Sequence, residues 1–115
     1  MKHLTILNFK TFLIVLFFAF CHSARAELNA DAAKAFAKEN NCFRCHGIDK
    51  DKDGPGWNKI AAKFKADPKG EEKLLRHLSS GEKAKFPDGH EENHMILKSD
   101  DPNATKNLVE WILSL

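Results

Sequence analysis

The chain has 115 residues, with 18 lysines and arginines against 16 aspartates and glutamates, which gives a formal net charge of +2. This length accommodates one small domain, and the charge is too close to balance to indicate nucleic acid or an acidic membrane surface as a partner. The excess itself comes from Lys2, Lys10 and Arg25, which no acidic residue accompanies within residues 1–26, so the rest of the chain carries a formal charge of −1.

Residues 1–26 have the pattern of a secretory signal peptide. A basic start is followed by an apolar run from Phe12 to Phe20 and by Ala24-Arg25-Ala26, a small-x-small cleavage site. The run is shorter than the roughly 20 residues of a membrane-spanning helix, although an uncleaved anchor is the alternative. We expect cleavage after about Ala26, export to the periplasm, and a mature domain of residues 27–115 with no stable membrane insertion.

The mature chain shows no convincing strand pattern, so we expect an all-α fold of three to five helices. Apolar spacing predicts a first helix over residues 29–40, with Asn29 or Asp31 as its N-cap. A polar loop over residues 47–56 closes with Gly54-Pro55-Gly56, where neither helix nor strand persists. A short helix is predicted over residues 58–65.

The second half of the chain is predicted to hold two more helices and a long loop. One helix covers residues 71–80 and stops at Gly81. Residues 81–100 form a loop rich in charges and turn residues, and a loop of this length in a small domain is usually functional. The last helix begins with Asp101 as N-cap and Pro102 in its first turn, and runs to Leu115 with an apolar stripe that contains Trp111.

The stretch Cys42-Phe43-Arg44-Cys45-His46 has the spacing by which haem is attached covalently to protein. Two thiols separated by two residues can form thioethers with both vinyl groups of a porphyrin, and the histidine that follows lies beneath the iron. Cys21 belongs to the predicted signal peptide, so these are the only thiols of the mature chain. In the oxidising compartment reached by export, these two thiols would form a disulfide unless another group reacted with them first. The motif predicts one covalent haem c per chain.

Two other kinds of site could use the same pair of thiols, a zinc site and a redox dithiol. Cys42 and Cys45 with His90 and His94 form a Cys2His2 ligand set for zinc, but the spacing between the pairs is far longer than the usual 12–15 residues, and His46 stays unused. A thioredoxin-like redox dithiol would follow a strand in a βαβ pattern, whereas a helix precedes this one.

With these features together, the chain resembles the class I cytochromes c of the small bacterial periplasmic monohaem type. The resemblance covers nearly all of residues 28–115 and rests on the helix before the Cys-x-x-Cys-His motif, on Gly54-Pro55, and on the last helix with Trp111. It implies a cytochrome c fold wrapped around one haem, with His46 as an iron ligand. It also implies that the Pro55 carbonyl accepts a hydrogen bond from His46, and that Trp57 lies near the haem edge.

The resemblance further implies a methionine as the second iron ligand. Met95 is the sole methionine of the mature chain, and it lies sixteen residues before Trp111, a separation similar to that in the family. The sequence departs from the family pattern here, because Ile96 rather than proline follows Met95. His94 is the rival ligand and would lower the potential through bis-histidine coordination; His90 is interpreted as a solvated loop residue.

The resemblance implies a soluble one-electron carrier that transforms no substrate and is therefore not an enzyme. Its partners would be redox protein donors and acceptors and the cytochrome maturation machinery, with no nucleic acid, and we expect a monomer. The alternative is a haem protein that binds a small gas or peroxide at an open or displaceable sixth position. Residues 57–85 hold eight basic residues against four acids, which could orient the protein toward a charged partner.

Overall fold

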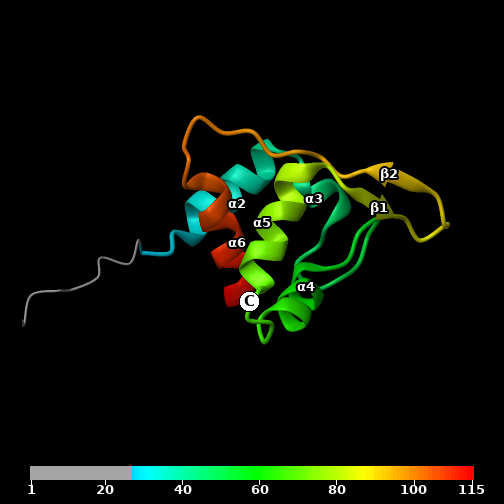
Figure 1. Ribbon diagram of the computed structural model, residues 1–115, viewed down its shortest axis with the longest axis horizontal. Coiled ribbons are helices and arrows are strands. Elements are labelled where there is room, and N and C mark those ends of the chain that lie inside the picture. The colour runs from blue at the N-terminus through cyan, green and yellow to red at the C-terminus, as the bar shows by residue number, and fades with distance from the viewer. Residues whose placement is uncertain (1–26) are drawn as a thin grey trace, which may run out of the picture.

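The computed structural model describes residues 27–115, so the predicted signal peptide lies outside the described residues. A group of helices forms the body of the domain, and a two-stranded hairpin projects from it (Figure 1). The expected helical fold is confirmed, with this small sheet added. In chain order the elements are α2 (Ala30–Glu39), α3 (Cys42–Cys45), α4 (Trp57–Phe64), α5 (Gly70–Ser80), β1 (Lys83–Lys85), β2 (Glu91–Asn93) and α6 (Ala104–Ser114).

Helix α2 begins where the sequence predicts, because Asn29 caps it. The Asn29 side chain accepts a hydrogen bond from the Ala32 amide at 2.9 Å, which satisfies one of the free donors of the first turn. Ala33, Phe36 and Ala37 fall on one face and are buried. The two alanines let a neighbouring helix approach closely, so this face becomes one side of the core.

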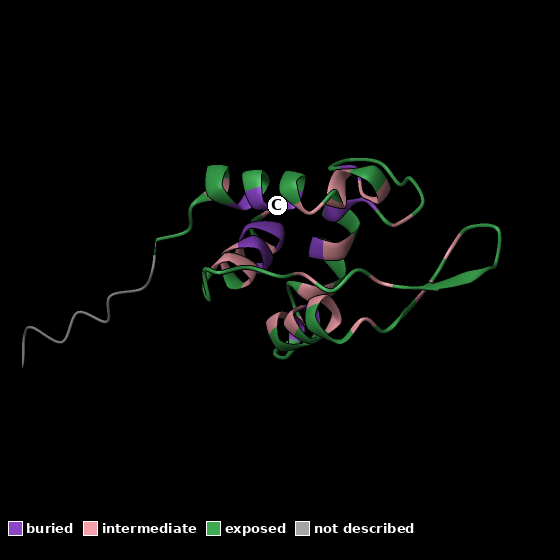
Figure 2. Ribbon diagram, turned by 90° about the horizontal axis from the view of Figure 1, so that it is seen from above, coloured by how far each residue is buried: buried purple, intermediate pink, exposed green. Residues whose placement is uncertain are grey.

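Helix α6 supplies the other side of the core. Leu108, Val109, Trp111 and Ile112 are all buried, as their helical spacing predicts, and α6 contacts α2, α4 and α5. The purple segments of Figure 2 show these buried faces meeting between the helices. Asn29 and Asn107 fasten the start of α2 to α6 through two hydrogen bonds of 2.9 and 2.8 Å, in which each residue donates one and accepts the other.

The hairpin is a feature that the sequence analysis missed, and the prediction that residues 81–100 form one loop without strands is wrong here. Lys83 pairs with Asn93 and Lys85 with Glu91 in an antiparallel register. Each strand has only three residues, and five of the six are exposed. Without a buried face the strands carry no alternation of apolar and polar residues, so periodicity cannot reveal them. The hairpin extends away from the helices in Figure 2.

The two ends of this region differ in how well they were predicted. Gly81 ends α5 in the left-handed conformation with φ 63°, which favours glycine, as expected. The last helix begins at Ala104 rather than directly after Asp101. The Asp101 carboxylate instead accepts the amide hydrogen of Asn103 at 2.8 Å, so it stabilises the turn before the helix.

Within residues 27–115, no helix combines the length and the apolar character needed to cross a membrane.

Leu108 provides a direct test of the core between α2 and α6. It is 1% exposed, so Leu108→Ala should lower the free energy of unfolding of the protein by about 2–5 kcal/mol. Leu28→Ala is the matched control, since Leu28 is 38% exposed and should change stability little. Denaturant unfolding measures both, and equal losses would place the core elsewhere.

Candidate functional site

The Cys-x-x-Cys-His stretch forms a single helical turn that follows α2 at a sharp bend. Asn41 adopts the left-handed conformation with φ 56°, and this bend sets α3 apart from α2. Cys42 and Cys45 lie three residues apart on that turn, so their side chains share one side of it. Both thiols are free and half-buried. The turn therefore presents two thiols side by side, followed at once by His46.

The protonation of Cys42 argues against a redox dithiol. Burial raises the pKa of the Cys42 thiol above its ordinary value, so the thiolate is disfavoured at neutral pH. A dithiol that attacks disulfides works as a thiolate, and its pKa is lowered by nearby positive charge or a helix N-terminus. The environment of Cys42 shifts its pKa in the opposite direction.

His46 is fixed through one nitrogen of its ring. Its Nδ1 lies 2.7 Å from the Pro55 carbonyl oxygen. A carbonyl can only accept, so Nδ1 carries the hydrogen and Nε2 keeps a free lone pair. This is the contact that the family resemblance implies. It leaves one imidazole nitrogen available to a metal and fixes the orientation of the ring.

Gly54 is required where the loop passes His46. A Cβ atom at this position would come within 2.6 Å of His46 Cε1, closer than nonbonded carbon atoms approach. The Gly54 amide donates a hydrogen bond to the Cys45 carbonyl at 2.8 Å, which holds the loop against α3. Glycine thus lets the backbone reach the imidazole, and the next residue delivers its carbonyl.

Asp51 stabilises the loop over residues 47–56 through contacts with the end of that loop and with α4. Its carboxylate accepts the Gly56 amide hydrogen at 2.8 Å and pairs with Lys59. These contacts, with the Gly56 amide as the larger cause, lower the pKa of Asp51. The carboxylate is therefore ionised throughout the neutral range, and the loop that carries Pro55 stays closed.

Trp57 connects this loop to the core. The residue is 3% exposed, and its ring centroid lies 4.6 Å from that of Phe43 and 4.8 Å from that of Trp111. The ring of His46 is stacked on the same indole at 6.3 Å. Trp57 is thus both a core residue and a neighbour of the site. It is also the first residue of α4, which begins one residue earlier than the sequence predicts.

Of the candidates for a second ligand, His94 has its ring near that of His46. The two ring centroids are 6.2 Å apart, and the His94 Nδ1 lies 2.9 Å from the Met95 carbonyl oxygen. Burial is the main cause that lowers the pKa of His94, and nearby His77 adds to it. Met95 is next in the chain, with 51% of its surface exposed.

His77 is a neighbour of the site that the sequence analysis did not predict. It projects from α5 with its ring centroid 4.2 Å from that of His94, and its Nδ1 lies 2.7 Å from the Glu82 carboxylate. The hydrogen bond with His77 lowers the pKa of Glu82. No local pattern in the sequence marks this histidine, because the contact forms only when the chain after β2 returns along α5.

His90 lies away from this group, as expected for a solvated residue. It sits on the hairpin, stacks on Phe86 at 4.3 Å and pairs with Asp88. The hydrogen bond with Asp88 raises the pKa of His90. Among residues 27–115 no three or more His, Cys, Asp or Glu side chains gather in a metal-binding cluster, so the Cys2His2 zinc arrangement is not formed.

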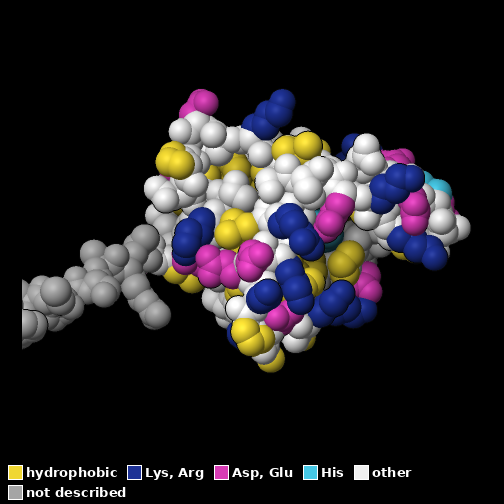
Figure 3. Space-filling model, viewed as in Figure 1, with side chains coloured by type: hydrophobic (Ala, Val, Ile, Leu, Met, Phe, Trp, Pro, Cys, Tyr) yellow, Lys and Arg dark blue, Asp and Glu magenta, His cyan; other side chains and the backbone are white. Residues whose placement is uncertain are grey.

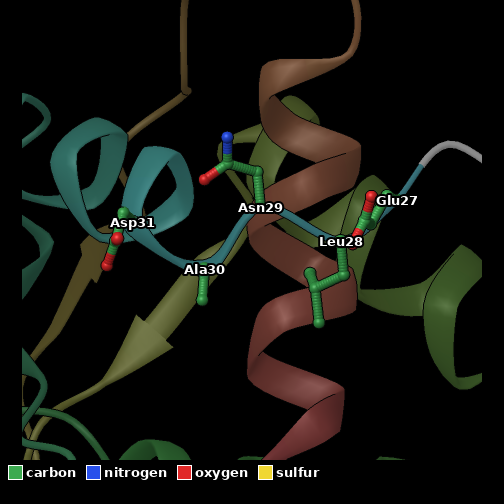
Figure 4. Close-up of a pocket in the computed structure, with 5 residues that line it drawn as sticks. All are labelled: Glu27, Leu28, Asn29, Ala30 and Asp31. Carbon is green, nitrogen blue, oxygen red and sulfur yellow. The ribbon is translucent and has the colours of Figure 1, made fainter.

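Two hollows of the described surface lie apart from these residues. One, of about 360 Å³, is lined by residues 27–31 where the chain enters α2 (Figure 4). Another, of about 480 Å³, lies between α2 and α6. Neither contains a residue of the Cys-x-x-Cys-His turn or of the histidine group.

Comparisons with known proteins agree with this geometry. The family model described as Cytochrome c matches residues 29–115. The crystal structure of the Class 1 cytochrome MtoD from Sideroxydans lithotrophicus ES-1 is similar, with 57% identity and a TM-score of 0.73; the match covers 76% of this chain and 97% of that one.

Two further relatives are more distant. Wild-type Nitrosomonas europaea cytochrome c552 is 26% identical with a TM-score of 0.58, over 71% of this chain and 98% of that one. Cytochrome c-551 of Pseudomonas denitrificans is 30% identical over 78 residues, which are 68% of this chain and 90% of the relative.

The residues present fit a covalently attached haem c. The turn of α3 offers two thiols on one side, and the imidazole that follows has Nδ1 engaged and Nε2 free. Apolar rings of Phe43 and Trp57 lie beside them. These are the donor types and the apolar surroundings that an iron porphyrin needs.

The close passage of Gly54 can be tested by substitution. Gly54→Ala should displace the imidazole of His46 from the Pro55 carbonyl, because the added methyl group overlaps Cε1. We expect a lower melting temperature and an altered visible spectrum of the haem-loaded protein. Asp53→Ala, at the exposed neighbouring position, is the control and should change neither property. A Gly54→Ala spectrum identical to that of the unchanged protein would contradict the contact.

Proposed function

Because the chain belongs to the cytochrome c family, whose members here are electron carriers with one covalently attached haem c, we propose that it is a periplasmic one-electron carrier between redox proteins. The haem, when bound, supplies an iron centre that accepts and returns one electron. The protein provides attachment, orientation and an apolar environment. It transforms no substrate of its own.

The observation that carries this proposal is the imidazole of His46 held by the Pro55 carbonyl. We assign the thioether bonds to Cys42 and Cys45, and the proximal ligand to Nε2 of His46. The hydrogen bond that Nδ1 donates to the Pro55 carbonyl raises the basicity of Nε2 and prevents rotation of the ring. A ligand fixed in this way would keep the His46 side of the iron similar in both oxidation states, so little reorganisation on that side would oppose electron transfer.

Buried aromatic residues limit the access of water to this side of the site. Trp57 is 3% exposed, and its ring packs against those of Phe43 and Trp111. These contacts connect the site to the α2–α6 core. Low local polarity is one of the factors that set the potential of such a centre. We propose that Trp57 lines the haem side of the core in addition to packing it.

We propose Met95 as the distal ligand. It is the single methionine of residues 27–115 and stands sixteen residues before Trp111, as the family resemblance implies. Thioether ligation favours ferrous iron and raises the potential. His94 is the alternative donor, and its ring centroid lies 6.2 Å from that of His46. Two donors at this place support a closed sixth position rather than one that is open to a gas or peroxide.

We also propose export and association with redox partners and the cytochrome maturation machinery, with the domain acting as a monomer in the periplasm. Residues 1–26 support export, and a pair of thiols without a disulfide is explained in an oxidising compartment by haem attachment. Lysines and arginines on the face in Figure 3 alternate with acidic side chains. Such a mixed charged face suits brief, salt-dependent encounters.

The covalent attachment is testable by mass spectrometry. After acid–acetone extraction, the mature protein should retain the mass of one haem, and Cys42→Ala or Cys45→Ala should lose one thioether and accumulate far less. Cys21→Ala is the matched control: it removes a thiol within the predicted signal peptide and should leave haem content unchanged. A haem that extracts completely, or a Cys42–Cys45 disulfide, would refute the assignment.

The role of Met95 predicts a change in potential. Met95→Ala removes the soft sulfur donor, so the ferrous state loses stabilisation and the reduction potential should fall. Ile96→Ala is the control, because Ile96 is adjacent and similarly exposed, at 48%. Potentiometric titration measures both variants. A potential that Met95→Ala leaves unchanged would remove Met95 from the iron.

A further inference from the structure

We propose that His94 and Met95 exchange at the iron, with His94 as the distal ligand of the ferric state and Met95 as that of the ferrous state. This inference rests on the proposed function, and it adds a ligand change that accompanies each electron transfer. It assigns to His94 a role beside Met95 rather than instead of it.

The first support is the separation of the two imidazoles. Two imidazoles on opposite sides of one metal, each with a metal–nitrogen bond of about 2 Å, have ring centroids about 6 Å apart. The rings of His46 and His94 are 6.2 Å apart. The chain therefore holds these rings at the distance that coordination from both sides requires.

The second support is that both rings are oriented in the same way. In His46, Nδ1 donates to the Pro55 carbonyl; in His94, Nδ1 lies 2.9 Å from the Met95 carbonyl and donates to it, since a carbonyl only accepts. Each imidazole thus keeps Nε2 free for a metal. Metal-binding histidines almost always have their other nitrogen bonded in this manner.

The third support is the set of contacts that positions His94. Its amide donates to the Glu82 carbonyl at 3.0 Å, and its ring lies against that of His77. The Glu82 carboxylate in turn holds His77 at 2.7 Å. His77 is therefore a positioning residue, which braces His94 from α5 without reaching the site itself.

The segment after His94 can rearrange without disturbing the fold. The His94 amide is bonded to Glu82, and the Leu97 amide donates to the Leu78 carbonyl at 2.9 Å. Between these two anchors stand only Met95 and Ile96, which are 51% and 48% exposed. Figure 1 shows this stretch running from β2 back past the C-terminal end of α5. A rotation confined to two residues can exchange the side chains.

The preference of each oxidation state follows from the donors. Imidazole is a harder donor than thioether, and a thioether ligand raises the potential because it binds ferrous iron relatively better. When a reduced partner protein gives one electron to the iron, the bond to His94 Nε2 breaks and a bond to Met95 Sγ forms. Each donor keeps its own lone pair, and oxidation by the acceptor reverses both changes.

Spectroscopy of the full haem-loaded protein in both oxidation states tests this inference. Electron paramagnetic resonance of the ferric protein should show two imidazole ligands, and proton NMR of the ferrous protein should show the strongly upfield-shifted methyl signal of bound methionine. His94→Ala should convert the ferric signal to that of His–Met ligation. His90→Ala, the matched control on the hairpin, should leave both spectra unchanged. His77→Ala should shift part of the ferric protein toward Met95.

Voltammetry provides a second readout that folding alone does not alter. Ligand exchange should widen the separation of the oxidative and reductive peaks as the scan rate rises, and either His94→Ala or Met95→Ala should abolish the widening. Methionine ligation of the ferric protein would overturn the exchange while leaving the electron carrier intact. A ferrous protein without bound methionine would overturn both the exchange and the Met95 assignment. Haem that is not covalently attached would instead refute the proposed function.

Discussion

The hydrogen bond from His46 Nδ1 to the Pro55 carbonyl is the contact on which the rest of the site depends. It requires α3 to end at His46 and the loop over residues 47–56 to return to it, with glycine at position 54 so that the backbone can pass. The Asp51 contacts keep that loop closed. One imidazole nitrogen is thereby used for orientation, and the other is kept for chemistry.

The α2–α6 pair provides the rigid support for this contact. Small residues of α2 allow α6 to approach, and the paired amides of Asn29 and Asn107 fasten the two helices. Trp57 connects this core to the site, because its indole packs against Trp111 on one side and against Phe43 and the ring of His46 on the other. Stability and ligand geometry are therefore linked through one aromatic side chain.

The sequence predicted the parts that are governed by local rules. The cap at Asn29, the stop at Gly81 and the buried faces of α2 and α6 follow from helix chemistry and periodicity, and the Cys42–His46 motif marks the centre of the site. The hairpin was missed because its strands are short and exposed. His77 was missed because only the tertiary return of residues 94–97 along α5 brings it to His94. Contacts between distant exposed segments leave no periodic trace.

The most direct test of the account is NMR of the imidazole groups in the reduced, haem-loaded protein with nitrogen-15-labelled histidine. Our account predicts that the ring of His46 alone shows large haem ring-current shifts and keeps a slowly exchanging Nδ1 proton, which the Pro55 carbonyl accepts. A His46 ring with ordinary shifts and a rapidly exchanging Nδ1 proton, or a different histidine with the shifted resonances, would contradict the central assignment.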